Sequence, residues 1–135
     1  MDLILWRHAQ AFDALPGFDD ASRALTPKGE GQAVRVAKWL DRQLPESTRV
    51  LASPAKRAEQ TVKALGRKYK LRDELVPGST ADELLALIKW SPDTGPPHKG
   101  AMLLVGHQPT LGQLFAKAQC GGCAAACVKI SGTPR

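Results

Sequence analysis

Near its N-terminus the chain reads Leu3-Ile-Leu-Trp-Arg-His8, an apolar run that stops abruptly at an arginine and a histidine. Four consecutive apolar residues without polar alternation are typical of a short strand that is buried on both faces. Buried strands of this kind occur in sheets that helices cover on both sides. The stretch therefore predicts a buried strand, and the polar pair marks its carboxyl end.

A helix is predicted after an intervening loop. The hydroxyl of Thr26 can cap it, and Pro27 occupies the first helical position, where a missing N–H costs nothing. Apolar residues recur at helical spacing as far as Leu44, and Pro45 ends the pattern. The first strand is thus followed by an amphipathic helix.

The same alternation continues along the chain. Further strands are predicted over 49–52, 71–75 and 101–105, the second of them more polar. Helices are predicted after Ser53-Pro54, which repeats the hydroxyl-then-proline start, after Thr80, which forms a capping-box pattern with Glu83, and near Thr110. Alternating strands and helices predict a three-layer α/β sandwich with a mainly parallel central sheet flanked by helices.

Length and composition restrict the class of protein. The chain has 135 residues, of which 43% are hydrophobic and 24% charged, as in one ordinary globular domain. We expect a single domain over 1–119 and an atypical tail, rich in Cys, Ala and Gly, over 120–135. No apolar run reaches bilayer length and no secretory leader is visible, so we expect a cytoplasmic monomer without membrane contact.

The charge is uneven and basic. The formal net charge is +6, and residues 23–72 carry 13 basic against four acidic side chains. Such a field attracts phosphorylated small molecules, acidic proteins or nucleic acid. A basic phosphate- or nucleic-acid-binding module without catalysis is therefore one alternative. However, Tyr69 is the only aromatic residue of the most basic stretch, 56–72, so stacking platforms for bases are missing and we expect no nucleic acid partner.

Three cysteines, Cys120, Cys123 and Cys127, lie close together in the tail. Their spacing is typical of metal or cluster ligands. No neighbouring His, Asp or Glu supplies the fourth ligand that a structural zinc site requires. We therefore expect no metal and reduced thiols.

Candidate site residues follow three of the predicted strands. Arg7 and His8 end the first strand, Arg57 stands in the first turn of the helix after the second, and His107 follows the last. Ligands of parallel sheets bind beyond the carboxyl ends of the strands. We therefore expect these two arginines and two histidines to converge on one patch.

The residue types indicate phosphoryl transfer. An arginine fork matches phosphate oxygens, and a helix N-terminus adds free N–H groups. A neutral histidine nitrogen can accept a phosphoryl group, while a second histidine donates hydrogen bonds to its oxygens. Arg57 at a positive helix end is electrostatically awkward unless an anion lies between them. The set predicts phosphoryl transfer without a metal ion or another cofactor.

The order of these motifs resembles the histidine phosphatase superfamily, which is phosphoglycerate mutase-like, and within it the small SixA-type phosphohistidine phosphatases. The matching segments are Leu3–Ala9, Arg23–Gly29, Ser53–Thr61 and Leu104–Pro109. The resemblance implies a metal-independent phosphatase that removes phosphoryl groups from protein phosphohistidine through a covalent phospho-His8 intermediate.

The resemblance also implies roles for single residues. It assigns catalysis to Arg7, His8, Arg57 and His107. The two arginines, the late histidine and Arg23 would bind the phosphate. Asp20 and Glu83 are candidates for an acid/base role or for support of the loop, with Asp20 ranked first because it precedes an arginine by three positions, as in SixA-like members. The implied partner is a phosphohistidine-bearing protein, such as a histidine-containing phosphotransfer domain. A phosphatase of small phosphomonoesters in the same pocket is the second alternative.

The tail departs from the family pattern. Members of this type continue past the late-histidine helix into a further strand, commonly with Lys-Lys-Gly and aromatic residues, whereas 127–135 lacks that pattern. We therefore expect the C-terminal strand to be missing or altered. Loss of a strand would expose a sheet edge and lower the stability of the chain.

Overall fold

The computed structural model describes residues 2–88, 101–107, 110–120 and 126–130. Its centre is a five-stranded sheet in the order β3-β2-β4-β1-β5, with every neighbouring pair parallel. The strands are β1 (Asp2–Arg7), β2 (Arg49–Ala52), β3 (Lys70–Leu71), β4 (Met102–Gly106) and β5 (Ala126–Ile130). The helices are α1 (Pro27–Gln43), α2 (Lys56–Lys63), α3 (Ala81–Ile88) and α4 (Thr110–Cys120), with 3-10 helices η1 (Asp20–Ser22) and η2 (Asp73–Leu75). Among these residues, no helix is both long and apolar enough to cross a membrane.

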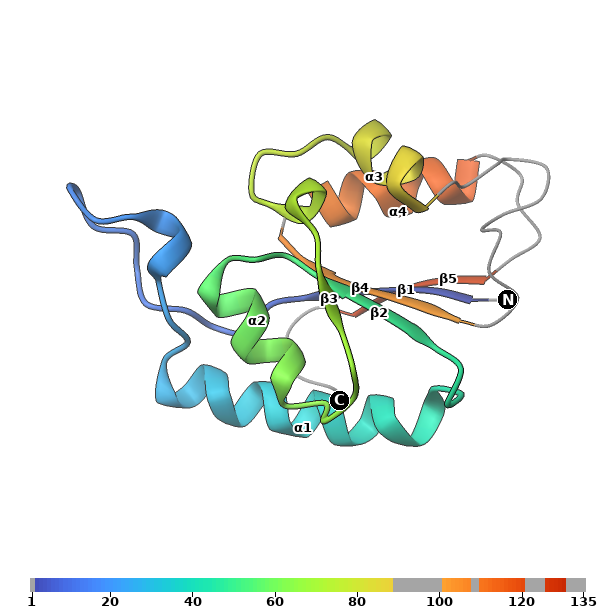
Figure 1. Ribbon diagram of the computed structural model, residues 1–135, viewed down its shortest axis with the longest axis horizontal. Coiled ribbons are helices and arrows are strands. Elements are labelled where there is room, and N and C mark those ends of the chain that lie inside the picture. The colour runs from blue at the N-terminus through green and yellow to red at the C-terminus, as the bar shows by residue number, and fades with distance from the viewer. Residues whose placement is uncertain (1, 89–100, 108–109, 121–125, 131–135) are drawn as a thin grey trace.

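Helices cover both faces of the sheet, α1 and α2 on one side and α3 and α4 on the other (Figure 1). The side chains of β1 alternate between the two layers. Ile4 and Trp6 belong to the core formed with α1 and α2, and Leu3 and Leu5 belong to the core formed with α3 and α4. Both faces need apolar side chains, which explains the uninterrupted apolar run. The predicted three-layer sandwich with a parallel sheet is confirmed.

Local signals fix two helix starts as predicted. The hydroxyl of Thr26 accepts a hydrogen bond from the Gly29 amide at 3.0 Å, and Pro27 begins α1. The hydroxyl of Thr80 accepts from the Glu83 amide at 3.1 Å just before α3. In both cases a side-chain oxygen satisfies an amide that has no partner within its helix.

The predicted cap of the second helix is wrong. α2 begins only at Lys56, and its N-cap is Ala55, which makes no side-chain hydrogen bond. Ser53, one of the residues expected to start this helix, instead has a partner in the candidate site.

The third strand is shorter than the predicted 71–75. β3 is Lys70–Leu71, and η2 follows it directly after Arg72. The neighbouring strand β2 ends at Ala52, whose carbonyl accepts from the Arg72 amide at 2.9 Å. Beyond that bond β2 offers no strand residue for pairing, so the chain turns.

The C-terminal strand is present, so the first part of the expectation that this strand is missing or altered is wrong. β5 pairs with β1 from Asp2↔Ala126 to Trp6↔Ile130. Strand pairing joins backbone groups and needs only an extended segment beside a free edge, which β1 provides. Because β5 lies in the segment that we set apart as a tail, the sheet extends across the division predicted at residue 119.

Candidate active site

Three neighbouring strands end at the same edge of the sheet, and the residues after them meet there. The His8 amide donates to the Gly106 carbonyl at 3.0 Å, and the Ser53 amide donates to the Val105 carbonyl at 2.9 Å. The rings of His8 and His107 lie with their centroids 5.1 Å apart. The predicted convergence of the strand ends is therefore confirmed in the structure.

These residues line one pocket of about 530 Å³. Its lining residues are Arg7, His8, Ala9, Gln10, Ala11, Arg23, Gln32, Arg57 and His107. The described residues that line the pocket thus include three arginines and no carboxylate. The pocket is built to receive an anion.

His8 has one ring nitrogen fixed and the other available. Its Nδ1 lies 2.7 Å from the carbonyl oxygen of Ala9. A carbonyl only accepts, so Nδ1 carries the proton and Nε2 keeps its lone pair. The pKa of His8 is lowered to about 4, mainly by burial and also by the charges of Arg57, Arg7 and Arg23, against the opposing effect of the Ala9 hydrogen bond. At neutral pH the ring is uncharged, as a nucleophile must be.

The backbone after His8 is anchored from two helices. The Ala9 amide donates to the Thr61 hydroxyl at 3.0 Å, and this hydroxyl donates to the Arg57 carbonyl at 2.7 Å. A side chain on Gly29 of α1 would collide with the carbonyl oxygen of Gln10, because helix and loop are in direct contact there. Only glycine fits at this position.

His107 is 4% exposed and leaves one nitrogen without a partner. Its Nε2 lies 2.8 Å from the hydroxyl oxygen of Ser53, which accepts from the Ala55 amide at 3.2 Å. Burial lowers the pKa of His107 to about 3, helped by the nearby His8 and Arg57. When the Ser53 hydroxyl donates its proton to Nε2, the neutral ring carries its own proton on Nδ1. This Nδ1 is buried and has no hydrogen-bond partner among the described residues.

Arg57 is 2% exposed and holds a loop with one side of its guanidinium group. Nη1 donates to the Asp20 carbonyl at 2.7 Å, and Nη2 donates to the Asp20 carboxylate at 2.9 Å. Its Nε is buried and has no hydrogen-bond partner within the described part of the chain. A buried donor without a partner costs about 1–3 kcal/mol, unless a ligand satisfies it.

Asp20 connects two arginines of the pocket. Its carboxylate accepts from Arg57 and, at 2.8 Å, from Nε of Arg23. Desolvation acts to raise the pKa of Asp20, but the hydrogen bonds from the two arginines outweigh it and hold the pKa below its usual value. Asp20 is therefore ionised at neutral pH. This state suits the support of Arg57 better than the donation of a proton.

The other predicted residues lie at different places. Arg7 is exposed at the mouth of the pocket, and Arg23 also lines it. Glu83 is not brought to this pocket: it lies in the first turn of α3 and lines a separate depression with Arg72 and Glu74.

No cluster of three or more potential metal ligands occurs among the described residues. The cysteine side chains, on which the expectation of reduced thiols rests, lie outside them.

Sequence reasoning missed the supporting residues. The sequence patterns assign Ser53 to a helix cap and give no role to Thr61, Gly29 or Gln32, whose side-chain oxygen accepts from the Gln10 amide at 3.1 Å. Thr61 stands four residues after Arg57, on the same helix face, and this spacing was an available signal. No local signal links Ser53 to His107, because their contact depends on β2 and β4 being neighbours.

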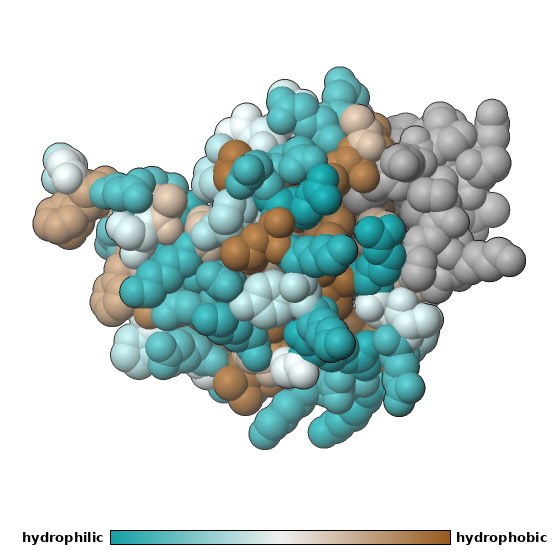
Figure 2. All heavy atoms as spheres, viewed as in Figure 1, coloured by the Kyte–Doolittle hydropathy of each residue, from teal (hydrophilic) through white to brown (hydrophobic). Residues whose placement is uncertain are grey.

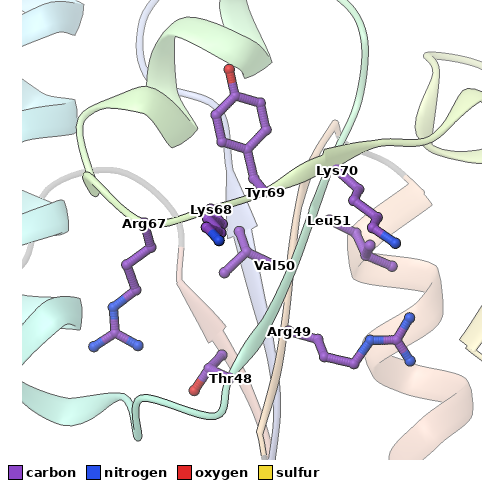
Figure 3. Close-up of a pocket in the computed structure, with 8 residues that line it drawn as sticks. All are labelled: Thr48, Arg49, Val50, Leu51, Arg67, Lys68, Tyr69 and Lys70. Carbon is purple, nitrogen blue, oxygen red and sulfur yellow. The ribbon is translucent and has the colours of Figure 1, made fainter.

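A second pocket lies between β2 and the segment that enters β3 (Figure 3). Its volume is about 540 Å³, and it is lined by Thr48, Arg49, Val50, Leu51, Arg67, Lys68, Tyr69 and Lys70. It begins at the opposite, amino end of β2 and contains no histidine. The Nε and both Nη atoms of Arg67 already donate to protein oxygens. Within the described part of the chain, no buried side-chain nitrogen of this pocket lacks a partner, in contrast to the first pocket.

Known proteins share the fold and the motifs. The family model described as "Histidine phosphatase superfamily (branch 1)" matches residues 3–80. The phosphohistidine phosphatase SixA of Escherichia coli (strain K12) is 32% identical over 123 residues, which are 87% of this chain and 73% of that protein. The structure of a protein histidine phosphatase SixA complexed with tungstate is 31% identical with a TM-score of 0.64, over 84% of this chain and 74% of that one.

A SixA-like protein of Nakamurella multipartitia has a solved structure that is 36% identical, with a TM-score of 0.68. The match covers 82% of this chain but 62% of that one. The family model covers more than half of this chain, and the resemblance seen in the motifs extends to whole folds. The chain belongs to the histidine phosphatase superfamily and is a SixA-type member of it.

Proposed function

We propose that this protein hydrolyses phosphohistidine on a partner protein through a phosphorylated His8. The observation that carries the proposal is the arrangement of three buried or half-buried nitrogens around one pocket. His8, with its available Nε2, lines this pocket together with Arg57 and His107, whose Nε and Nδ1 are buried without a partner among the described residues. A phosphoryl group supplies both an electrophilic phosphorus and the acceptor oxygens that these donors lack.

The proposed reaction has two displacements. In the first, the lone pair of His8 Nε2 forms a bond to phosphorus, and the bond from phosphorus to the substrate nitrogen breaks. The electron pair of that bond stays on the substrate imidazole, which takes up a proton. In the second, water attacks phospho-His8, loses a proton and releases phosphate, and Nε2 regains its lone pair. Arg7, Arg57 and Arg23 neutralise the charge on the phosphoryl oxygens, and the neutral His107 ring donates a hydrogen bond to one of them.

The leaving group makes few demands on the protein. Imidazole nitrogen is protonated near neutral pH, so solvent can supply the proton. This agrees with an ionised Asp20, to which we assign the positioning of Arg57 and Arg23. A cytoplasmic location and a monomeric state stay predictions.

The covalent step is tested by trapping. We expect wild-type enzyme, mixed with a phosphotransfer domain carrying [³²P]phosphohistidine and quenched in alkaline denaturant, to retain label on the peptide that contains His8. The matched control His8→Ala should retain no label and lose at least about 1,000-fold in kcat, as expected when a covalent nucleophile is removed. Circular dichroism checks that this variant is folded. Label retained by His8→Ala contradicts the assignment.

The substrate class is tested by competition between substrate types. We expect kcat/KM for the phosphorylated phosphotransfer domain to exceed that for glucose 6-phosphate by at least about 100-fold, because only the protein substrate has a nitrogen leaving group and a surface to bind. Equal values for the two substrates favour the alternative, a phosphatase of small phosphomonoesters with the same intermediate.

A further inference from the structure

A loop beside the pocket exposes large apolar side chains. Phe12, Leu15 and Phe18 are 54%, 58% and 73% exposed, and they lie within residues 12–18, here called the apolar loop. The loop projects from the body of the molecule, at the left in Figure 1, and its tip is coloured as hydrophobic in Figure 2. Contiguous exposed apolar surface on a folded domain marks an interaction site more often than chance.

The stem of this loop is part of the pocket. Ala11 lines the pocket and forms an antiparallel bridge with Leu25. The Phe12 amide donates to the Ala24 carbonyl at 3.0 Å, and the Phe12 carbonyl accepts from Nη1 of Arg23 at 2.7 Å. An arginine that lines the pocket thus holds the base of the apolar loop in place.

The backbone at the tip of the apolar loop has a defined turn, but the large side chains there do not pack in the core. The Phe18 amide donates to the Leu15 carbonyl at 3.2 Å, and Gly17 between them adopts a left-handed φ of 82°. None of the three large apolar side chains belongs to a core cluster of the described residues. The exposed apolar surface therefore does not stabilise this domain.

We propose, on the basis of the proposed function, that the apolar loop binds the protein substrate through an apolar patch beside its phosphohistidine. Leu15 stands four residues after Ala11, which lines the pocket. Four fully extended residues span at most about 13 Å. The complementary patch then lies within about 13 Å of the pocket rim, the length of about two helical turns. A helix that carries the phosphohistidine and apolar side chains one and two turns away fits this span.

The exposed apolar area of the loop and the acidic residues beside it favour a transient contact with a protein. The exposed parts of the three side chains amount to roughly 350 Å², less than half of the approximately 800 Å² per partner in a stable interface. A contact of this size supplements phosphoryl recognition and still allows release. Asp13 and Asp19 flank the apolar side chains, which disfavours an anionic membrane surface as the occupant.

The experiment compares a protein substrate with a small one that has the same leaving group. The probes are a phosphotransfer domain phosphorylated on histidine and N-phosphoimidazole. The variant is Leu15→Ser/Phe18→Ser, which changes only exposed side chains, and the matched control is Trp39→Ser, which removes an exposed apolar side chain from α1. We expect the double variant to lose about tenfold or more in kcat/KM for the protein, mainly through KM, and to change less than about twofold for N-phosphoimidazole. The control should behave as wild type with both.

The outcomes separate the docking proposal from the proposed function. Equal kinetics of wild type and double variant with both probes overturn docking while the phosphohistidine activity stands. Parallel losses with both probes also overturn it, because they assign the loop to the support of the pocket. A wild-type enzyme that hydrolyses glucose 6-phosphate but neither phosphohistidine probe overturns the proposed function itself. A dimer in sedimentation, or vesicle binding, that the double variant abolishes replaces the protein substrate as the occupant and overturns docking.

Discussion

The two pockets have nearly the same volume, about 530 and 540 Å³, and both contain arginine, yet only one has the features of an active site. Nε of Arg57 in the first pocket is buried and has no partner among the residues that the structure describes. Arg67 in the second donates from Nε to Asp41 at 2.9 Å, and its Nη atoms donate to carbonyl oxygens at the end of α1, including that of Leu44. Among the described residues, every nitrogen of the Arg67 guanidinium group donates to a protein oxygen, whereas Nε of Arg57 has no protein partner.

The comparison teaches that size and positive charge do not identify the site. What distinguishes the first pocket is buried donor capacity that the protein does not use, next to a histidine with an available nitrogen. Buried polar groups are nearly always satisfied, so two buried nitrogens without a partner among the described residues, both from residues that line one pocket, favour a ligand there. Arg67 shows the ordinary case, in which a guanidinium group closes the end of a helix.

The largest difference in kcat/KM between the two pockets is expected when the arginine of each, Arg57 or Arg67, is replaced by lysine. Arg57→Lys should lower kcat/KM by about 10- to 100-fold, or about 1–3 kcal/mol, because an ammonium group cannot reproduce the fork. Arg67→Lys should leave kcat/KM within about twofold but lower the free energy of unfolding by about 1–2 kcal/mol, because hydrogen bonds to the end of α1 are lost. Steady-state kinetics and urea unfolding of both variants check this. Similar effects of the two substitutions on kcat/KM would break the distinction between the pockets.

Acid should destabilise the first pocket specifically. The pKa values of His8 and His107, about 4 and 3 in the folded state, lie below the ordinary 6.5. The unfolded chain therefore binds more protons, and stability that is present above pH 6.5 is lost as the pH falls toward 4. Between pH 7.5 and 5 we expect a loss on the order of 1–2 kcal/mol per histidine. His107→Asn should show a smaller loss in urea unfolding.

A control for the acid effect comes from the second pocket. The pKa of Tyr69 is raised, mainly by desolvation and then by its hydrogen bond to Glu59, so this tyrosine stays neutral throughout the tested range. Tyr69→Phe should therefore keep the wild-type dependence between pH 7.5 and 5. The same pH dependence in His107→Asn as in wild type speaks against a buried neutral imidazole.

The role of Asp20 should appear as a moderate effect without a change in pH profile. Asp20→Asn weakens the charged contact to Arg57, so we expect kcat/KM to fall by about 3- to 10-fold, as for one charge-assisted hydrogen bond at a half-exposed group. The shape of the pH–rate profile between pH 5 and 8 should stay the same, and Glu83→Gln should have no effect. A basic limb that disappears in Asp20→Asn assigns the proton donor to Asp20 after all.

The smallest effect is expected from chelation. The described lining of the first pocket supplies positive charge from three arginines and offers no carboxylate to hold a divalent ion. We therefore expect kcat/KM after treatment with EDTA to equal that of untreated enzyme. Activity that EDTA removes and Mg²⁺ restores would show that the arginines do not suffice.

The sequence by itself determined the parts that depend on neighbouring residues. Within the apolar run of β1, and within each of the caps at Thr26 and Thr80, the residues that interact lie a few positions apart, so short-range geometry determines the local structure. The types of residue at the strand ends also followed from the chain, because a strand that stops at Arg7 must present what comes next at the sheet edge. The resemblance to the family rests on these same local segments.

Only the tertiary structure decided what those segments meet. The order β3-β2-β4-β1-β5 brings Ser53 to His107 and closes the free edge of β1 with β5. These pairings join residues that are far apart in sequence, so no local periodicity or cap encodes them. For the same reason Ser53, expected to begin a helix, instead fixes a histidine, because the buried imidazole of the neighbouring strand offers its hydroxyl a partner in the core.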